Sequence, residues 1–188
     1  MESILQTPRL WLREMMEADF PDLCEILQDE ETMYAYEHTF SDAEAWDWLH
    51  RQQARYRRDG FGLWAMIRRE DGAFIGQAGL TMQDWEGRRV PEIGYLLKRR
   101  HWHCGYATEA ACGCRDHAFG TLGLDAVYSI IRDTNAASRR VALRVGMHQV
   151  GRFVKHYYGM DMPHDVFCVT NGTADFPAQA TTPANSKA

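Results

Sequence analysis

The stretch HWHCGYATEAACGC, residues 101–114, decides how the rest of the chain is interpreted. It places two histidines and three cysteines within fourteen residues. Zinc prefers thiolate and imidazole ligands, so a metal site is the first interpretation. The second interpretation is a glycine turn that opens a helix, because such a turn can bind an anion through main-chain N–H groups.

The spacing of the cysteines argues against zinc. Residues 106–120 have the pattern of a helix that ends in glycine, and on a helix Cys112 and Cys114 point about 200° apart. They cannot both bind one ion, and only Cys114 and His117 share a face. We therefore expect no metal and interpret the cysteines as small core residues. The ligands considered are His101, His103, Cys104, Cys112, Cys114 and His117.

The elements around the glycine turn favour an anion site. Residues 90–97 have the pattern of a strand, and a helix is expected to begin near Ala107. The free N–H groups and the dipole of that helix would then face one concavity, where Gly105 permits close approach of a ligand. Arg99 and Arg100 precede the turn and could compensate negative charge. An ordinary tight turn is the alternative.

Composition limits the classes of protein to consider. The chain has 188 residues, of which 45% are hydrophobic and 12% aromatic, as expected for one globular domain. We expect this domain at residues 1–170, followed by a flexible tail at 171–188. The net charge of −5 gives no global positive field for nucleic acid. With no signal-peptide pattern, no apolar run of membrane-spanning length and an odd number of cysteines, we expect a cytoplasmic protein without membrane partners.

The remaining pattern predicts a mixed α/β sheet, with antiparallel hairpins first and a strand–helix–strand crossover later. Ser41 and Glu44 form a capping box, and Asp71-Gly72 is a hairpin turn signal. Pro91 indicates an edge position or an irregularity in its strand. Strands are expected at 9–14, 61–69, 73–82, 90–97, 126–132, 149–158 and 165–170, with a polar turn at 84–89. Helices are expected from Asp19, at 41–59, at 106–120 and at 135–146.

Two ordered motifs show a family resemblance. WHCGYATEA at 102–110 and NAASRRVALRVGM at 135–147 resemble the GCN5-related N-acetyltransferases (GNAT), above all their ribosomal-protein alanine acetyltransferase subgroup. The acyl-CoA loop of the family, Gln/Arg-x-x-Gly-x-Gly/Ala, corresponds here to Trp102, Gly105 and Ala107. The second motif of the family corresponds to Asn135, Ser138 and Gly146. TPRLWLRE and PEIGYLL resemble two of its strands, so the resemblance covers residues 7–169.

The resemblance implies a GNAT fold, with a single mixed, mostly antiparallel sheet of six to seven strands and about four helices. It also implies acetyl-CoA as acetyl donor, bound where the strand at 90–97 splays from its neighbour. His103-Cys104 departs from the common Gly-Lys of the subgroup, so the phosphate loop requires His103 to tolerate the local backbone conformation. The expected acetyl-CoA residues are Tyr95, Leu96, Leu97, Trp102, His103, Cys104, Gly105, Tyr106, Ala107, Thr108, Asn135 and Ser138.

The resemblance further implies direct acetyl transfer to a primary amine, for which Glu92 is the candidate base and Ser138 the candidate donor to the leaving thiolate. Each has a structural alternative: an edge salt bridge for Glu92, and a hydrogen bond to the main chain for Ser138. Asn135 would orient the pantetheine or simply cap its helix. Tyr157 and Tyr158 are lower-ranked candidates for the acid.

The acceptor side is expected at residues 33–40, 84–89 and 155–164. Aromatic side chains with a carboxylate suit a cationic amine, although solvated loop residues are the alternative, and Trp64 and Trp85 could equally be core. The acceptor would be a protein N-terminus, a polyamine or another small amine, and the protein a monomer or homodimer. A catalytically weak CoA-binding sensor is the alternative function. The expected acceptor residues are Tyr34, Glu37, Trp85 and Tyr157.

Overall fold

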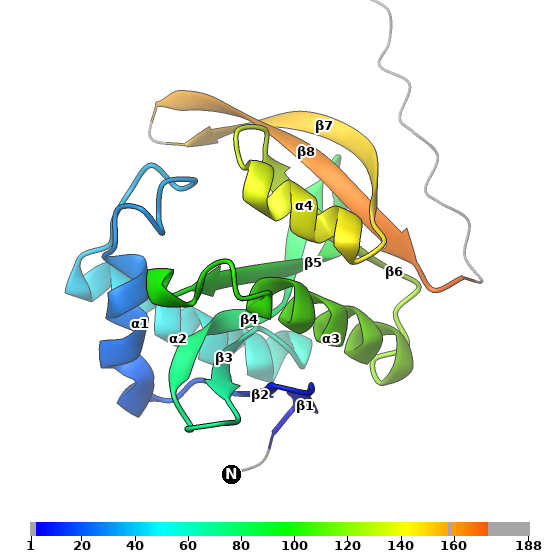
Figure 1. Cartoon of the computed structure of the whole chain (residues 1–188). Coiled ribbons are helices and arrows are strands. Elements are labelled where there is room, and N and C mark those ends of the chain that lie inside the picture. The colour runs from blue at the N-terminus through cyan, green and yellow to red at the C-terminus, as the bar shows by residue number, and fades with distance from the viewer. Residues whose placement is uncertain (1–2, 158, 173–188) are drawn as a thin grey trace, which may run out of the picture.

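The computed structural model describes residues 3–157 and 159–172 (Figure 1). Within this part, the strands form one sheet of eight in the order β1-β2-β3-β4-β5-β6-β8-β7. Only the β5–β6 pair is parallel, so the predicted mixed, mostly antiparallel sheet is confirmed. The strands are β1 (Leu5–Gln6), β2 (Leu10–Arg13), β3 (Leu63–Arg68), β4 (Phe74–Trp85), β5 (Arg88–Leu97), β6 (Ala126–Arg132), β7 (His148–Tyr157) and β8 (Met160–Thr170).

The helices begin and end at the residues that their capping signals indicate. The first follows Asp19 with Pro21 in its first turn, and the second begins at the reciprocal capping box of Ser41 and Glu44. Gly60, with φ of 78°, ends the second helix. The helices of the described residues are α1 (Phe20–Leu27), α2 (Asp42–Asp59), α3 (Tyr106–Gly120) and α4 (Ala136–Arg144).

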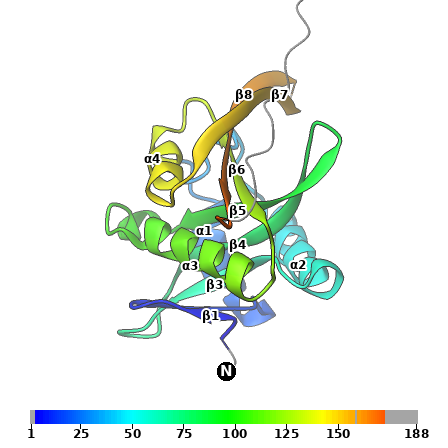
Figure 2. The same ribbon diagram turned by 90° about the vertical axis from the view of Figure 1, so that its right-hand side faces the viewer.

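Two hydrophobic layers cover the sheet. Small residues of α3, such as Ala110, Cys114 and Ala118, are fully buried against one face. Leu23 of α1 and Leu49 of α2 are fully buried against the other. Figure 2 shows α3 and α2 on opposite sides of the sheet. The two layers cover the middle strands on both faces. A binding site within the sheet therefore requires two middle strands to separate.

The strand predictions need three corrections. The sheet has eight strands rather than six to seven, because β1 contributes a two-residue pair with β2. The last strand begins at Met160, five residues before the expected start, since β7 pairs with it along its whole length. The polar turn predicted at 84–89 is only Glu86-Gly87, both with positive φ, and the flanking residues belong to β4 and β5.

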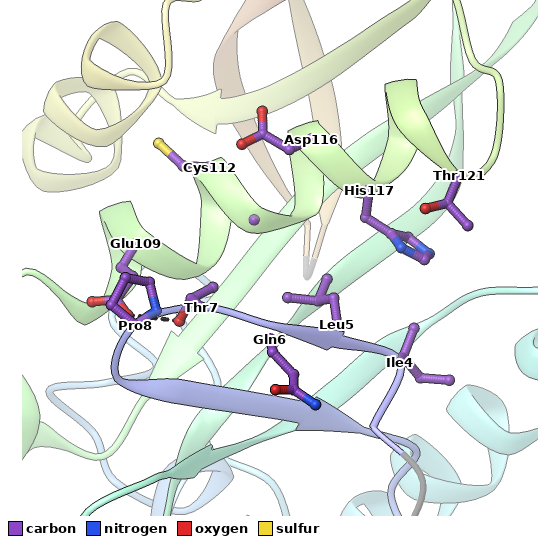
Figure 3. Close-up of a pocket in the computed structure, with 11 residues that line it drawn as sticks. Ile4, Leu5, Gln6, Thr7, Pro8, Glu109, Cys112, Asp116, His117 and Thr121 are labelled. Atoms are coloured by element: carbon purple, nitrogen blue, oxygen red, sulfur yellow. Dashed lines mark hydrogen bonds between the residues drawn. The ribbon is translucent and has the colours of Figure 1, made fainter.

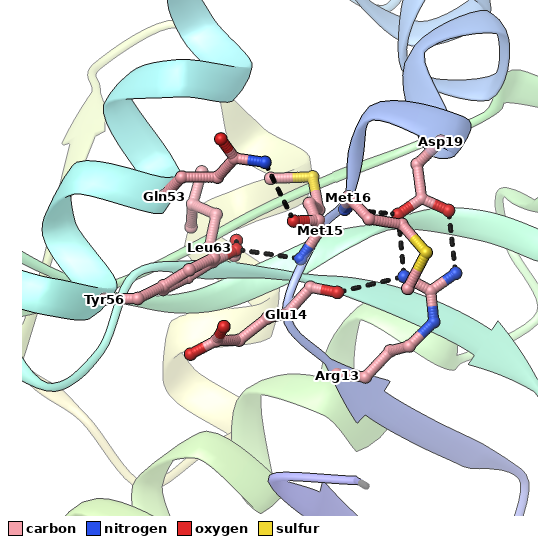
Figure 4. A network of polar contacts seen from close by, with 8 residues as sticks. All are labelled: Arg13, Glu14, Met15, Met16, Asp19, Gln53, Tyr56 and Leu63. Carbon is pink, nitrogen blue, oxygen red and sulfur yellow. Dashed lines mark hydrogen bonds and ion pairs between the residues drawn. The ribbon is translucent and has the colours of Figure 1, made fainter. Parts of the chain in front are cut away.

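Polar contacts fasten α1 and α2 to the sheet (Figure 4). The Tyr56 hydroxyl donates to the carbonyl of Leu63 and accepts from the N–H of Met15 at 3.2 Å. Arg13 makes a two-pronged ion pair with Asp19, at 2.7 Å for each oxygen. Because these groups are buried or nearly so, the Tyr56 contacts fix the position of α2 over β3, and the Arg13–Asp19 pair ties the start of α1 to β2.

Pro91 lies in β5, between β4 and β6, so its strand is not an edge strand. It pairs with Met82 of β4 without a shift in register, and it stands one residue before the β5–β6 pair that joins Glu92 and Tyr128. No helix of the described ranges is both long and apolar enough to cross a membrane. The predicted tail at 171–188 lies outside the described residues beyond Gly172.

Candidate functional site

The candidate site is organised by the separation of β5 and β6. These parallel strands pair at one position, Glu92 with Tyr128, and β5 then runs five residues further to Leu97. Strand alternation places the main-chain groups of Ile93, Tyr95 and Leu97 on the β6 side. The carbonyl of Ile93 accepts from the Ser129 hydroxyl, at 3.2 Å. The carbonyl of Leu97 accepts from the Trp102 indole, at 3.0 Å. Of the three, Tyr95 has no such partner on that side among the described residues.

Glu92 lies at the point of divergence. Its Oε1 accepts the N–H of Ile130 at 3.1 Å, and the residue as a whole is partly exposed. Burial raises the pKa of Glu92, and the opposing effects of the Lys155 charge and the Ile130 N–H are smaller. A carboxylate with a raised pKa, at the point where two strands separate, is a better proton acceptor than an ordinary glutamate.

The loop before α3 has the backbone conformation of an anion site. His103 has φ of 60° and Gly105 has φ of 83°, so both are left-handed. Main-chain hydrogen bonds in the described residues include none donated by the N–H groups of residues 103–105. The first turn of α3 adds further unpaired N–H groups and the positive end of the helix dipole. His103 thus adopts the conformation that the loop needs.

A network behind this loop holds it in place. Glu109, in the first turns of α3, accepts from the Thr7 hydroxyl at 2.6 Å and from Arg9 Nε at 2.6 Å. Arg9 also donates to the carbonyl of Cys104 at 3.0 Å and lies 4.4 Å from the centre of the Tyr106 ring. Burial disfavours the charged carboxylate, but the bonds from Thr7 and Arg9 outweigh it and lower the pKa of Glu109.

A cavity of about 480 Å³ lies beside this network, between β1 and α3 (Figure 3). It is lined by residues 4–8 and by the α3 side chains that follow Thr108, including Glu109 and Cys112. None of the expected acetyl-CoA or acceptor residues lines it. The cavity is therefore distinct from the site at the end of β5.

The cationic residues before the loop are paired with acidic residues. Arg99 forms an ion pair with Glu31, and Arg100 with Glu25 at 2.6 Å. The expectation that both compensate an anion in the loop is thus weakened, since each already faces a carboxylate. Arg144 of α4 is exposed and makes no ion pair with the described residues.

The start of α4 faces the separated part of β5. Asn135 is the N-cap, and its Oδ1 accepts the N–H of Ser138 at 3.0 Å. The Tyr95 hydroxyl lies 3.4 Å from the carbonyl of Ser138, and burial raises the pKa of Tyr95 to about 12. The structure therefore brings together Tyr95, Asn135 and Ser138, with Asn135 in the capping role that was its alternative.

The residues predicted for the acceptor side do not all lie where an acceptor could contact them. Tyr34 is exposed, and Glu37 forms an ion pair with Arg132 of β6 at 2.5 Å, so its negative charge is already compensated. Trp85 is only 2% exposed and packs in the core against Tyr128, which corrects its expected place in an open acceptor site. Trp64, considered with it, is also core. Tyr157 ends β7, and Tyr158 lies outside the described residues.

The histidine–cysteine cluster is dispersed. Cys114 is buried in the core, and burial raises the pKa of the Cys112 and Cys114 thiols. His117 packs edge-on against Trp64, and His101 packs against Tyr106. In the part of the chain that the structure describes, no three His, Cys, Asp or Glu side chains are arranged to hold a metal ion.

Several contributors were missed by the sequence reasoning. Thr7 and Arg9 stabilise the loop from about 100 residues away in sequence, through their hydrogen bonds to Glu109 of α3. The ion pair of Arg132 with Glu37 was also not predicted, because Arg132 has the pattern of an ordinary strand end. The one local signal was its position after a buried apolar run, where a charged side chain leaves the core and becomes available for contact.

Comparison with known proteins establishes the family. Residues 9–148 match the acetyltransferase (GNAT) domain. The uncharacterized protein YkkB of Bacillus subtilis is 36% identical over 77% of this chain and 84% of its own. A GNAT acetyltransferase from Bacillus anthracis superposes with a TM-score of 0.77 at 18% identity, covering 88% of this chain and 97% of its own. Mycobacterium smegmatis RimJ in complex with CoA-disulfide superposes with a TM-score of 0.73 at 21% identity, covering 90% of this chain and 86% of its own. The chain belongs to the GNAT family and is an acetyltransferase.

The left-handed backbone of His103 leads to a testable expectation. A β-branched residue is strongly disfavoured at positive φ, so His103→Val should destabilise the protein by about 1–2 kcal/mol and weaken CoA binding. His103→Gly should keep the loop and at least the wild-type melting temperature, because glycine adopts this conformation without strain. Thermal unfolding and calorimetric titration with CoA measure both effects. Equal stability and affinity for the two variants would show that the loop does not depend on this conformation.

Proposed function

We propose that this acetyltransferase moves the acetyl group of acetyl-CoA directly to a primary amine. The observation that carries the proposal is the position of Glu92, a partly exposed residue whose carboxyl pKa is raised by burial, at the point where β5 and β6 separate. The match to the GNAT domain and the CoA complex of the M. smegmatis neighbour support the choice of donor.

In this proposal the pyrophosphate of CoA binds the N–H groups of residues 103–108. The pantetheine extends between the separated strands, along residues Tyr95–Leu97, beside Asn135. The main-chain N–H of Tyr95 is directed to that side and would donate to the thioester carbonyl oxygen. The expected set also includes Leu96, Trp102, Cys104, Tyr106, Ala107 and Thr108.

The transfer itself needs two proton movements. Glu92 takes a proton from the ammonium, directly or through a water, and the amine nitrogen then attacks the carbonyl carbon of the thioester. The C–S bond breaks, and the attacking nitrogen loses its second proton. Ser138 donates its hydroxyl proton to the leaving sulfur and receives the proton from nitrogen in return, while Glu92 releases the first proton to solvent. The products are an amide and CoA thiol. Tyr157 remains a second proposed acid at the end of β7.

The finer assignments belong to the same proposal. The ribosomal-protein acetyltransferase subgroup favours a peptide N-terminus as acceptor, next to a polyamine or another small amine. We place the protein in the cytoplasm as a monomer or homodimer, with its catalytic domain at residues 1–170. Tyr34 and Glu37 would line the acceptor side, Glu37 through its contact with Arg132.

A thiol-release assay tests the proposal. The protein is incubated with acetyl-CoA and a panel of peptides, amino acids, polyamines and aminoglycosides, and CoA thiol is measured with a chromogenic disulfide. We expect amine-dependent release of thiol, with the N-acetylated product found by mass spectrometry. Tight CoA binding without turnover for every amine would favour the sensor function and reject the transferase.

A further inference from the structure

Arg55 of α2 is a half-buried cation without an ion-pair partner. Among the described residues no carboxylate lies at ion-pair distance, and its one hydrogen bond is to Gln52 Oε1 at 3.1 Å. Burial, together with the nearby Arg51 and Arg58, lowers the pKa of Arg55. A partly desolvated guanidinium in a positive environment is costly unless an anion binds to it.

Two acidic residues on this side of the protein already have ion-pair partners. Asp59 pairs with Arg58 at 2.5 Å and lies 3.8 Å from Arg89. Across the site, Glu37 pairs with Arg132 at 2.5 Å. Asp59 and Glu37 are therefore engaged with other arginines, and Glu92 is the remaining carboxylate whose charge acts on Arg55.

Arg55 and the candidate base Glu92 lie close enough for each charge to shift the pKa of the other. Lys155 also acts on Glu92, as the largest opposing charge. The surroundings of the base thus include two cations. An acceptor with a second ammonium group, such as a polyamine, would place like charges together.

A continuous stripe connects Arg55 with the expected acceptor loop. Trp48, Arg51 and Arg55 repeat at helical spacing along one face of α2. The Arg51 guanidinium lies 5.5 Å from the centre of the Trp48 ring, and Tyr36 of the loop packs edge-on against the same ring at 6.3 Å. Arg55 therefore stands at the end of a stripe that begins in the acceptor loop.

We propose that Arg55 determines acceptor specificity by binding a carboxylate of the amine substrate. The acceptor class is then a primary amine that carries a carboxylate, either an amino acid or a peptide with an acidic residue near its N-terminus. The ammonium would face Glu92 while the carboxylate binds the guanidinium. This inference rests on the proposed acetyl transfer.

Matched acceptor pairs test it. One pair is an amino acid and its amide, and the other is a Ser-Glu and a Ser-Gln peptide, both with amidated C-termini. A guanidinium–carboxylate contact predicts that wild type prefers the acidic member of at least one pair by about tenfold or more in kcat/KM. Preference in the amino-acid pair identifies an α-carboxylate, and preference in the peptide pair identifies an acidic side chain.

Variants of Arg55 assign the effect to this residue. Arg55→Gln should remove the preference by raising KM for the acidic acceptor alone, and Arg55→Lys should keep part of it. Arg55→Glu should shift the preference towards a diamine. Arg57→Gln is the matched control, because it removes the same charge from an exposed position on the same helix and should retain the wild-type preference.

Two outcomes overturn the inference: no preference in wild type for either pair, or an unchanged preference in Arg55→Gln. Failure of the acetyl transfer itself is distinguishable, since no acceptor would then release thiol. In that case calorimetric titration of the same pairs, with CoA present, still decides the role of Arg55. Tighter binding of the acidic member, lost in Arg55→Gln, supports it, and equal binding of both members rejects it.

Discussion

Glu92→Gln is expected to lower kcat/KM for acetyl transfer by about 10²-fold or more while CoA binds as in wild type. The amide keeps the shape of the side chain and can still accept the N–H of Ile130, which lies 3.1 Å from Glu92 Oε1. It cannot accept a proton from the ammonium. The loss should therefore appear in turnover rather than in affinity for CoA.

The pH profile gives a second readout of the same change. A base must be deprotonated, so the kcat/KM of wild type should fall as the pH drops through the raised pKa of Glu92. This acidic limb should disappear in Glu92→Gln. Its persistence, or an unchanged rate, would remove Glu92 from the proton transfer and leave it as a structural carboxylate.

Loss of folding is not expected to explain the result. Because burial raises the folded-state pKa of Glu92 above that of an exposed glutamate, protonation of this group stabilises the folded protein as the pH falls. At neutral pH the charged form is the disfavoured one, so a neutral amide should not lower the melting temperature. Glu70→Gln, in the exposed turn between β3 and β4, is the control and should retain full activity.

Features with a local cause could be predicted from the sequence. The capping box of Ser41 and Glu44 and the helix end at Gly60 depend on residues within one or two turns, and both are present. The turn at residues 102–105 also has a local cause, because a glycine there precedes an alanine-rich helix. The order of the elements therefore followed from short patterns.

Features that depend on residues far apart in the sequence could not be predicted from it. β1 has only two residues, too few to show alternation, and exists because β2 pairs with it. The last strand also begins before its expected start: Pro163 lies within β8, beyond the last β6–β8 pair, Arg132 with His164, where β8 needs no donor on that side. The pair of Glu37 and Arg132 joins positions 95 residues apart, and no local pattern encodes it.

Gly79→Ala is expected to destabilise the protein by about 3 kcal/mol or more, the upper end of the cost of overpacking. A Cβ at Gly79 would lie 2.0 Å from the carbonyl oxygen of Gly62 and 3.0 Å from the Leu63 Cα. Both neighbours are main-chain atoms, so β3 would have to move. The melting temperature should fall by roughly 6–12 °C for a chain of this size.

The movement would reach α2, because Leu63 is where this helix is attached. Its carbonyl accepts from Tyr56, and its N–H donates to Gln52 Oε1 at 3.1 Å. Displacement of β3 therefore breaks buried hydrogen bonds on both sides of one residue, each of which leaves a polar group without a partner. It also shifts Arg55, which lies on the same helix, so acetyl transfer should decline together with stability.

Gly94→Ala is the control that separates close packing from the mere presence of glycine. Gly94 faces Gly79 in the β4–β5 register, yet a Cβ there would only touch Leu63 Cδ2 at 3.5 Å, an ordinary contact. The free energy of unfolding of Gly94→Ala should lie within about 1 kcal/mol of the wild-type value. Thermal and denaturant unfolding of both variants measure this difference. If Gly79→Ala were as stable as Gly94→Ala, β3 would be able to move at Gly62 without loss of stability, and the prediction would be wrong.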